Sequence, residues 1–146
     1  MMSPAPFVIL IAEDNPTDVM IMREALEGAK VRVELHAVSD GVAALEFLRR
    51  IGPNRAAPRP DLILLDLNMP RKNGHEVLAE VKMDLDLKKI PVVMLTTSQA
   101  EDDVAKAYAH NVNCYIRKPV DFENFVEVVR GIEQFWFTVV TLPKES

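Results

Sequence analysis

The sequence has 146 residues, 49% of them hydrophobic, and its 22 acidic and 17 basic residues give a formal net charge of −5. This length suits one compact domain with its own core, and the scattered Lys and Arg residues argue against nucleic-acid binding, which usually needs a clustered basic face. The single cysteine, Cys114, excludes an internal disulfide and a cysteine-based zinc site, and the sequence shows neither a signal peptide nor an apolar run of membrane-spanning length, so we expect a cytoplasmic protein.

The first predicted element is a buried strand. Residues 7–12 form a continuous apolar run that ends at Glu13 and Asp14. A run that is apolar on both faces suits a central strand of a parallel sheet covered by helices. Asn15, a capping residue followed by proline, predicts the start of a helix that ends at Gly28.

An edge strand and a second helix follow. Residues 31–38 alternate apolar and polar side chains, so one face of this strand is expected to meet water, as at the edge of a sheet. Apolar residues at helical spacing predict a helix over residues 40–50. Residues 51–60 hold three prolines and are typical of a surface loop.

Two further buried strands flank a third helix. Residues 62–65 and 92–95 are apolar runs that end at Asp66 and Thr96. Residues 75–87 between them have a helical pattern. The inward positions of this helix are predicted to be Val77, Leu78, Val81 and Leu85.

The remaining elements are more weakly patterned. Residues 100–110 predict a helix with few apolar anchors, and residues 114–116 a short fifth strand that leads to Lys118. Residues 121–132 predict a final helix with an apolar inward stripe. Residues 143–146 form a polar end.

Strand–helix alternation with short links predicts an α/β fold, a (βα)5 doubly wound, flavodoxin-like parallel sheet with right-handed crossovers. Strand order 2-1-3-4-5 fits best, because it puts the alternating second strand at an edge and the apolar strands inside. We expect one domain over residues 1–134 and a C-terminal apolar tail extension over residues 135–146.

Polar residues end four of the predicted strands. Strands 1 and 3 end in Glu13, Asp14 and Asp66, strand 4 ends in Thr96 and strand 5 in Lys118. Ligands in open α/β sheets bind at the carboxyl ends of strands near the switch in strand order, which lies here between strands 1 and 3. Neighbouring carboxylates repel one another, and Mg²⁺, which prefers oxygen ligands, removes that repulsion. These carboxylates, with a lysine and a threonine beside them, predict a site for metal-assisted phosphoryl transfer. In such chemistry a carboxylate can form an aspartyl-phosphate.

These motifs resemble those of response-regulator receiver domains, over about residues 7–132. The motif residues are Glu13-Asp14-Asn15, Asp66-Leu67-Asn68-Met69-Pro70 with Gly74, Thr96-Thr97-Ser98 and Lys118-Pro119. The sequence also resembles the single-domain regulators that partner phytochrome-type sensor histidine kinases. That narrower resemblance is carried by residues 61–70, residues 95–98 and the tail from Phe135-Trp136-Phe137 to Leu142-Pro143.

The resemblance implies a phosphate-accepting site that uses Mg²⁺ as its cofactor. Asp66 would accept a phosphoryl group from a phosphohistidine on a kinase or phosphotransfer protein. Asp14 and Asp66 would bind Mg²⁺ directly and Glu13 would help, commonly through water. The backbone carbonyl of Asn68 would be a further ligand.

Other positions have implied roles in charge stabilisation and switching. Lys118, joined to the following proline by a cis peptide, would pair with the phosphoryl oxygens. Thr96 would hydrogen-bond the phosphoryl group and shift toward it, while Tyr115 would swing inward as the switch aromatic. Plain packing on an edge strand is an equally open interpretation of Tyr115. Asn68 and Ser98 occupy positions that tune dephosphorylation in the family.

The resemblance therefore implies a phosphorelay response regulator without an output domain. It would accept phosphate from a sensor histidine kinase, of phytochrome type by the narrower resemblance, and act through protein contacts or onward phosphotransfer. It would not be an enzyme beyond Mg²⁺-dependent self-phosphorylation and autodephosphorylation. The loops around Thr96 and the weak helix at residues 100–110 would be its moving parts.

Two other functions stay open. A Mg²⁺-dependent phosphatase of the haloacid-dehalogenase type would also use an Asp nucleophile, but such enzymes have a second Asp two residues later, where this chain has Asn68. A receiver-shaped adaptor would bind partners without phosphorylation, and the complete acceptor set argues against it. A dinucleotide-binding enzyme is disfavoured because no G-x-G-x-x-G follows the first strand.

The last helix and tail carry more apolar surface than a monomer of this size needs. The residues that add this surface are Val128, Phe135, Trp136, Phe137, Val139, Val140 and Leu142. We expect a homodimer built on the last helix, the fifth strand and the tail. The alternative is a tail folded back on its own core.

Overall fold

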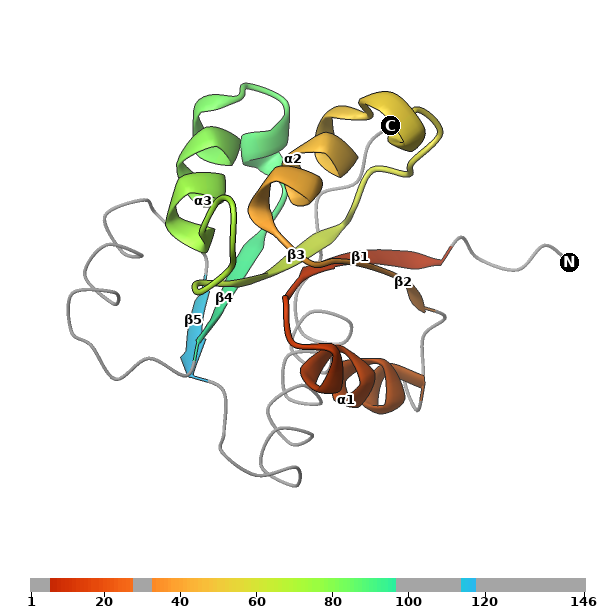
Figure 1. The fold of residues 1–146 in the computed structure, drawn as a ribbon. Helices are drawn as coiled ribbons and strands as arrows, with labels where there is room; N and C mark the ends of the chain where they lie inside the picture. The colour runs from red at the N-terminus through yellow and green to blue at the C-terminus, as the bar shows by residue number, and fades with distance from the viewer. Residues whose placement is uncertain (1–5, 28–32, 97–113, 118–146) are drawn as a thin grey trace, which may run out of the picture.

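The computed structural model describes residues 6–27, 33–96 and 114–117 (Figure 1). Within them, a five-stranded parallel sheet has the order β2-β1-β3-β4-β5. The strands are β1 Phe7–Ala12, β2 Val33–Val38, β3 Leu62–Asp66, β4 Val92–Thr96 and β5 Cys114–Arg117. The predicted strand order is confirmed, and the strand with alternating polarity lies at an edge as expected.

Helices lie on both faces of the sheet, which confirms the doubly wound fold. α1 (Pro16–Glu27) covers one face, whereas α2 (Gly41–Arg49) and α3 (Gly74–Met83) lie together on the other (Figure 1). Short 3₁₀ turns follow α2 at Gly52–Asn54 and α3 at Leu87–Lys89. In the described part of the chain, no helix is long and apolar enough to cross a membrane.

The two central strands supply much of the core because they are apolar on both faces. Leu10 and Ile11 of β1 and Leu64 and Leu65 of β3 are buried. α2 and α3 pack Leu45, Phe47, Leu78 and Val81 against Leu10 and Leu65. Burying one such side chain stabilises the fold by about 1.5–3 kcal/mol, so β1 and β3 hold their carboxyl ends firmly in place.

The edge strand β2 is only half-buried, but its polar face is less exposed than the sequence predicts. Glu34 is exposed, whereas the ring of His36 lies 5.2 Å from the ring of Phe47 on α2. His36 Nε2 also lies 2.7 Å from Glu34 Oε2. Ala37, on the other face, is exposed. The prediction of one dry and one wet face was therefore too simple, because α2 packs over part of the polar face.

The helix predicted over residues 75–87 is wrong at its C-terminal end. α3 ends at Met83, and Leu85, predicted to face inward, is 76% exposed. The carboxylate of Asp84 accepts hydrogen bonds from the backbone N–H groups two and three residues later (2.9 and 3.0 Å), which replaces the helix by a turn. These donors, that of Leu87 first, lower the pKa of Asp84 below its ordinary value. Leu87 is buried in place of Leu85.

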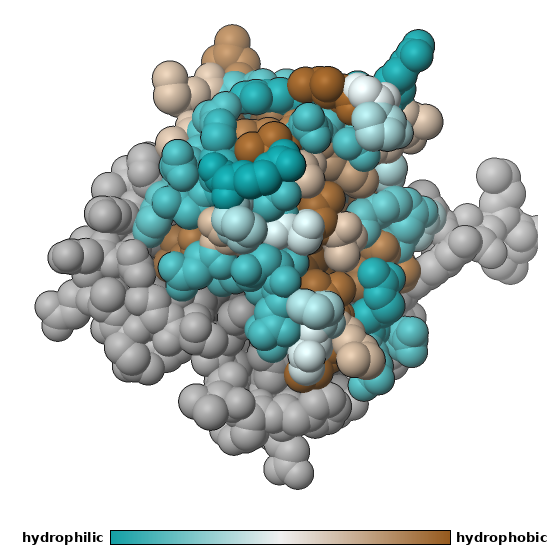
Figure 2. Space-filling view, viewed as in Figure 1, coloured by the Kyte–Doolittle hydropathy of each residue, from teal (hydrophilic) through white to brown (hydrophobic). Residues whose placement is uncertain are grey.

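The described residues form a mainly hydrophilic surface in this view, with apolar side chains in small groups (Figure 2). Among the described residues, the exposed large apolar side chains are Met20, Ile51, Met83 and Leu85. They belong to α1 and to the C-terminal ends of α2 and α3 or the segments just beyond. No continuous apolar face marks a binding surface in this part of the chain.

Three predicted segments lie outside the described residues. These are the helix over residues 100–110, the helix over residues 121–132 and the tail over residues 135–146. The homodimer, which would use the last two, stays a prediction.

Candidate functional site

The acids predicted from the strand ends meet at one edge of the sheet. β1 and β3 are neighbours with Ala12 aligned to Leu65, so that Glu13 and Asp66 follow at the same level. The carboxylate oxygens of Glu13, Asp14 and Asp66 lie within 4.8 Å of one another. We call these three residues the acid cluster.

The acid cluster is buried at two residues and open at the third. Glu13 and Asp66 are only 3% and 4% exposed, whereas Asp14 is exposed. Burial disfavours the charged form of a carboxylate, and nearby like charges add to that penalty. Core packing gives no reason to hold such groups together.

Hydrogen bonds from neighbouring residues orient the β1 side of the cluster. The N–H of Glu13 donates to the carbonyl of Val38 (3.0 Å), and the N–H of Asn15 donates to Glu13 Oε2 (3.2 Å). Asn15 Oδ1 accepts from the N–H groups of Thr17 and Asp18 (2.9 and 3.3 Å) and caps α1. The predicted cap is confirmed, and the asparagine supplies it.

The three carboxylates fit a hard divalent cation. Mg²⁺ prefers oxygen ligands and usually takes only one or two protein carboxylates, keeping several waters. The exposed side of the cluster, at Asp14, leaves room for those waters and for a phosphate oxygen. A cation at this position would also offset the repulsion between Glu13 and Asp66.

The loop after β3 carries Asn68 and packs closely against α3. Leu67 and Met69 are buried, whereas Asn68 between them is exposed. The N–H of Gly74 donates to the carbonyl of Leu67 (3.0 Å), and a Cβ at Gly74 would lie only 2.8 Å from the Leu67 Cα. α3 therefore begins directly against the end of β3, which explains the glycine in the motif.

β4 and β5 end at the same edge as the acid cluster. Asp66 is aligned with Leu95 of β4, and Thr96 with Arg117 of β5, so β5 leads straight to residue 118. The predicted site features outside the described residues are Lys118 with its cis peptide, Ser98, and the side chains of Thr96 and Tyr115. Their roles stay predictions.

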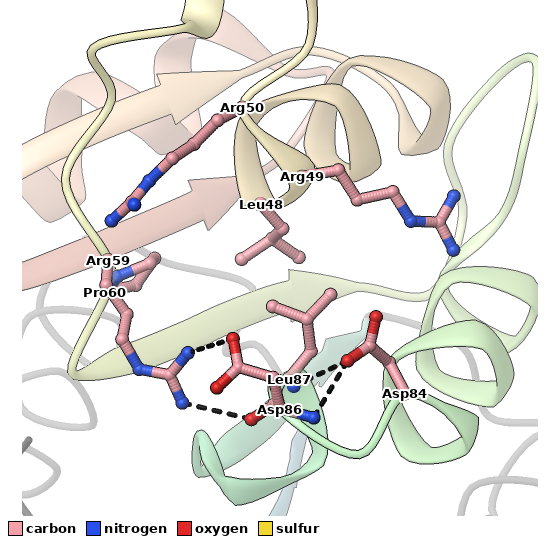
Figure 3. Close-up of a pocket in the computed structure, with 8 residues that line it drawn as sticks. All are labelled: Leu48, Arg49, Arg50, Arg59, Pro60, Asp84, Asp86 and Leu87. Carbon is pink, nitrogen blue, oxygen red and sulfur yellow. Dashed lines mark hydrogen bonds and ion pairs between the residues drawn. The ribbon is translucent and has the colours of Figure 1, made fainter.

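A second group of charged residues lies at the amino end of β3. A cleft of about 380 Å³ there is lined by Leu48, Arg49, Arg50, Arg59, Pro60, Asp84, Asp86 and Leu87 (Figure 3). Arg59 donates to the carboxylate of Asp86 (2.8 Å) and to its backbone carbonyl (3.0 Å). Opposite charges pair with each other in this cleft, so it is better explained as local structure than as a binding site.

The residues that hold the loop after β3 could not be identified from the sequence. These are Asp40, Gly41, Arg71, Lys72 and Glu80. Their partners lie far apart in the chain, so no periodicity marks them. One signal was available, since a glycine in the first turn of α2 is a poor helix former and indicates a close contact.

The family model for the response regulator receiver domain matches residues 9–130. The chain belongs to this family. The matched residues of this receiver include the acid cluster, the loop after β3 and the ends of β4 and β5. The predicted resemblance is thereby confirmed.

This receiver is similar to known response regulators over almost its whole length. It is 49% identical to response regulator Rcp1 of Synechocystis sp. over 141 residues, which cover 97% of this chain and 96% of Rcp1. It is 42% identical to the probable methanogenesis regulatory protein FilR2 of Methanothrix harundinacea over 132 residues, 90% of this chain and 84% of FilR2.

Solved structures show the same likeness. The phosphorylated cyanobacterial phytochrome response regulator RcpA matches with a TM-score of 0.93 and 48% identity, covering 96% of this chain and 100% of RcpA. The Mn²⁺-bound form of Rcp1 matches with a TM-score of 0.91 and 49% identity, covering 95% and 100%. Receiver domains bind Mg²⁺ or Mn²⁺ at an acidic pocket, and the acid cluster has the composition of such a pocket.

Proposed function

We propose that this receiver accepts a phosphoryl group on Asp66 from the phosphohistidine of a sensor histidine kinase, and that phosphorylation switches its protein contacts. The observation that carries the proposal is the burial of Asp66 at the end of the central strand β3, within 4.8 Å of two carboxylates from the end of β1. Phosphorylation adds nearly two negative charges, which is a large local change for such a site.

The transfer exchanges one bond to phosphorus for another. A carboxylate oxygen of Asp66 attacks the phosphorus, the P–N bond of the phosphohistidine breaks as the P–O bond forms, and the imidazole takes up a proton. When bound, Mg²⁺ supplies positive charge against the carboxylate and phosphoryl oxygens. Asp14 and Asp66 would hold it directly, Glu13 through water and Asn68 through its backbone carbonyl.

The remaining site residues would act on the phosphorylated form. Lys118 would pair with the phosphoryl oxygens, and Thr96 would hydrogen-bond them and shift. Tyr115 would follow Thr96 inward. Asn68 and Ser98 would set the rate of autodephosphorylation, the only other reaction that we assign to the protein.

The proposed kinase is of phytochrome type. The similarity to RcpA and Rcp1 over nearly the full length of each chain supports this partner. The output would be a protein contact or onward transfer to a phosphotransfer protein, in the cytoplasm. We propose a receiver domain over residues 1–134, with the last helix, the fifth strand and the tail over residues 135–146 forming a homodimer.

Phosphotransfer tests the proposed acceptor. Full-length wild type, Asp66→Asn and the control Glu34→Gln, an exposed carboxylate on β2, would be mixed with radiolabelled phosphohistidine kinases, with Mg²⁺ or EDTA. We expect labelling of wild type and Glu34→Gln with Mg²⁺ only, and none of Asp66→Asn. Equal labelling of Asp66→Asn would show that another residue is the acceptor, and no labelling of wild type by any histidine kinase or by acetyl phosphate would favour the adaptor function.

Sedimentation tests the proposed dimer. Wild type and Trp136→Ala would be compared at micromolar concentration, with and without phosphorylation. We expect a dimer for wild type and a weaker one for the variant. A monomer in all four samples would refute this part of the proposal.

A further inference from the structure

The loop after β3 contains a strained turn. Arg71 has a φ of 66°, a value that side chains with a Cβ rarely adopt. The N–H of Lys72 donates to the carbonyl of Pro70 (2.7 Å), so these three residues form a γ-turn with a positive central φ. Such turns are rare and persist only where the surrounding structure enforces them. This one comes shortly after Asn68.

An ion pair ties the γ-turn to the start of α2. Arg71 Nε lies 3.5 Å from Asp40 Oδ1, and the same oxygen accepts a hydrogen bond from the N–H of Ala43 (2.7 Å) as the cap of α2. The side chain of Asp40 is only 13% exposed, so its position is well defined by its neighbours. The cap and the turn therefore share one carboxylate oxygen.

Further contacts press the turn against α2 and α3. A Cβ at Gly41 would lie 2.8 Å from the Cβ of Lys72 and would collide with its backbone carbonyl. The ammonium group of Lys72 pairs with Glu80 of α3, and the other oxygen of Glu80 accepts from Arg49 at the end of α2 (3.2 Å). The turn is thus held by the start of α2 and by Glu80 of α3, which also pairs with the C-terminal end of α2.

These contacts are poorly explained by stability alone. The side chain of Arg71 is 56% exposed, and ion pairs with that exposure add little to stability. A glycine at position 71 would adopt the same positive φ without strain. The strained turn and its ion pair therefore give the fold no stability that a glycine would lack. Strain kept beside a site is a sign that the site needs that geometry.

We propose that Asp40 and Arg71 are positioning residues for the divalent cation. Their ion pair fixes the γ-turn against α2 and thereby fixes the loop backbone at Asn68 beside the acid cluster. This inference rests on the proposed function, which supplies the cation site.

Two substitutions separate positioning from simple electrostatics. Asp40→Asn removes the charge and keeps a good helix cap. Arg71→Gln removes a positive charge near the cluster. If only long-range charge mattered, Arg71→Gln would bind a cation more tightly, whereas loss of positioning makes it bind more weakly. Whether Arg71→Gln weakens or strengthens cation binding therefore decides between positioning and long-range electrostatics.

Manganese binding to the full-length chain provides the measurement, without any phosphodonor. Free Mn²⁺ would be quantified by electron paramagnetic resonance, and folding would be followed by urea denaturation. We expect Asp40→Asn and Arg71→Gln each to weaken binding by about tenfold, the scale seen when partners of metal ligands are removed. The double variant should be no weaker than the single ones, because both remove the same contact.

Two controls make the outcome interpretable. Asp86→Asn breaks an ion pair at the other end of the sheet and should leave Mn²⁺ affinity unchanged. Arg71→Gly, which accepts the positive φ without strain, should fold normally and lose affinity as Arg71→Gln does. Unchanged or tighter binding by Arg71→Gln, with binding abolished in Asp66→Asn, would overturn the positioning role and leave the proposed function standing. If Asp14→Asn and Asp66→Asn both bound Mn²⁺ as tightly as the wild type, the cation site itself would be overturned.

Discussion

The charged side chains are arranged differently at the two ends of the sheet. At the carboxyl ends of β1 and β3, the acid cluster gathers like charges, two of them buried. At the amino end of β3, Arg59 pairs with Asp86 beside a cleft of about 380 Å³. Charges that neutralise each other stabilise local structure, whereas neighbouring buried carboxylates repel one another, and a bound cation would relieve that repulsion. The arrangement of charge, rather than the presence of a cleft, therefore indicates which end is functional.

The largest difference in stability is expected between alanine substitutions of glycines at the two ends of the sheet. Gly74→Ala would drive a Cβ against the backbone of Leu67 and lower the free energy of unfolding by about 2–3 kcal/mol. Gly52→Ala, beyond α2, meets nothing within 4 Å and has only the strain of its φ of 60°, about 1 kcal/mol. Urea unfolding of both full-length variants measures this, and equal losses would mean that the β3–α3 contact is looser than the structure indicates.

Removing one charge from the acid cluster should stabilise the metal-free protein. Asp66→Asn relieves repulsion at a buried site and should raise the free energy of unfolding in EDTA by about 1–2 kcal/mol. Mg²⁺ should shrink that gain, because it stabilises only the protein that binds it. A variant less stable than wild type in EDTA would contradict the view that function, not folding, maintains the cluster.

Glu80, which pairs with Lys72 and Arg49, should add a pH-dependent contribution to the free energy of unfolding. The hydrogen bond from Lys72 is the main cause of its pKa lying below the ordinary 4.5. A lowered pKa in the folded state adds stability above the unfolded pKa, and that stability is lost as the pH falls through the folded pKa. Glu80→Gln should therefore lower the free energy of unfolding by less than about 1 kcal/mol at neutral pH, since the pair is partly exposed, and by a smaller amount at an acidic pH well below 4.5. Urea titrations at both pH values would refute this if the loss were the same.

The smallest effect is expected at the amino end. Asp86→Ala removes the partner of Arg59, but the Asp86 side chain is 68% exposed, so the loss should be about 0.5 kcal/mol. Phosphorylation from a histidine kinase should proceed as in wild type. A clear fall in phosphorylation would show that the two ends of the sheet are coupled.

The strand order and the acid cluster could be predicted because their signals are local. Uninterrupted apolar runs mark β1, β3 and β4, and each run stops at the polar residue that reaches the site edge. Parallel strands carry their carboxyl ends to one edge, so Glu13 and Asp66 had to come close once β1 and β3 were neighbours. The cap at Asn15 was likewise readable from adjacent residues.

Features that depend on distant or competing contacts could not be predicted. The helical period continued to Leu85, but the Asp84 carboxylate bonds the following backbone and ends α3 early. Arg71 and Asp40 are separated by a helix, a loop and a strand, so no spacing rule links them. The positive φ of Arg71 was hidden because nothing in the sequence requires a non-glycine residue to adopt it.

Asp66 is the residue that we propose carries the phosphoryl group. The most direct measurement is to phosphorylate the full-length protein with a histidine kinase and Mg²⁺, reduce the acyl phosphate with borohydride, and map the modified residue by mass spectrometry. We expect homoserine at position 66 and unchanged aspartate at position 14. Conversion at position 14 or at any other residue, with Asp66 unchanged in fully phosphorylated protein, would contradict it.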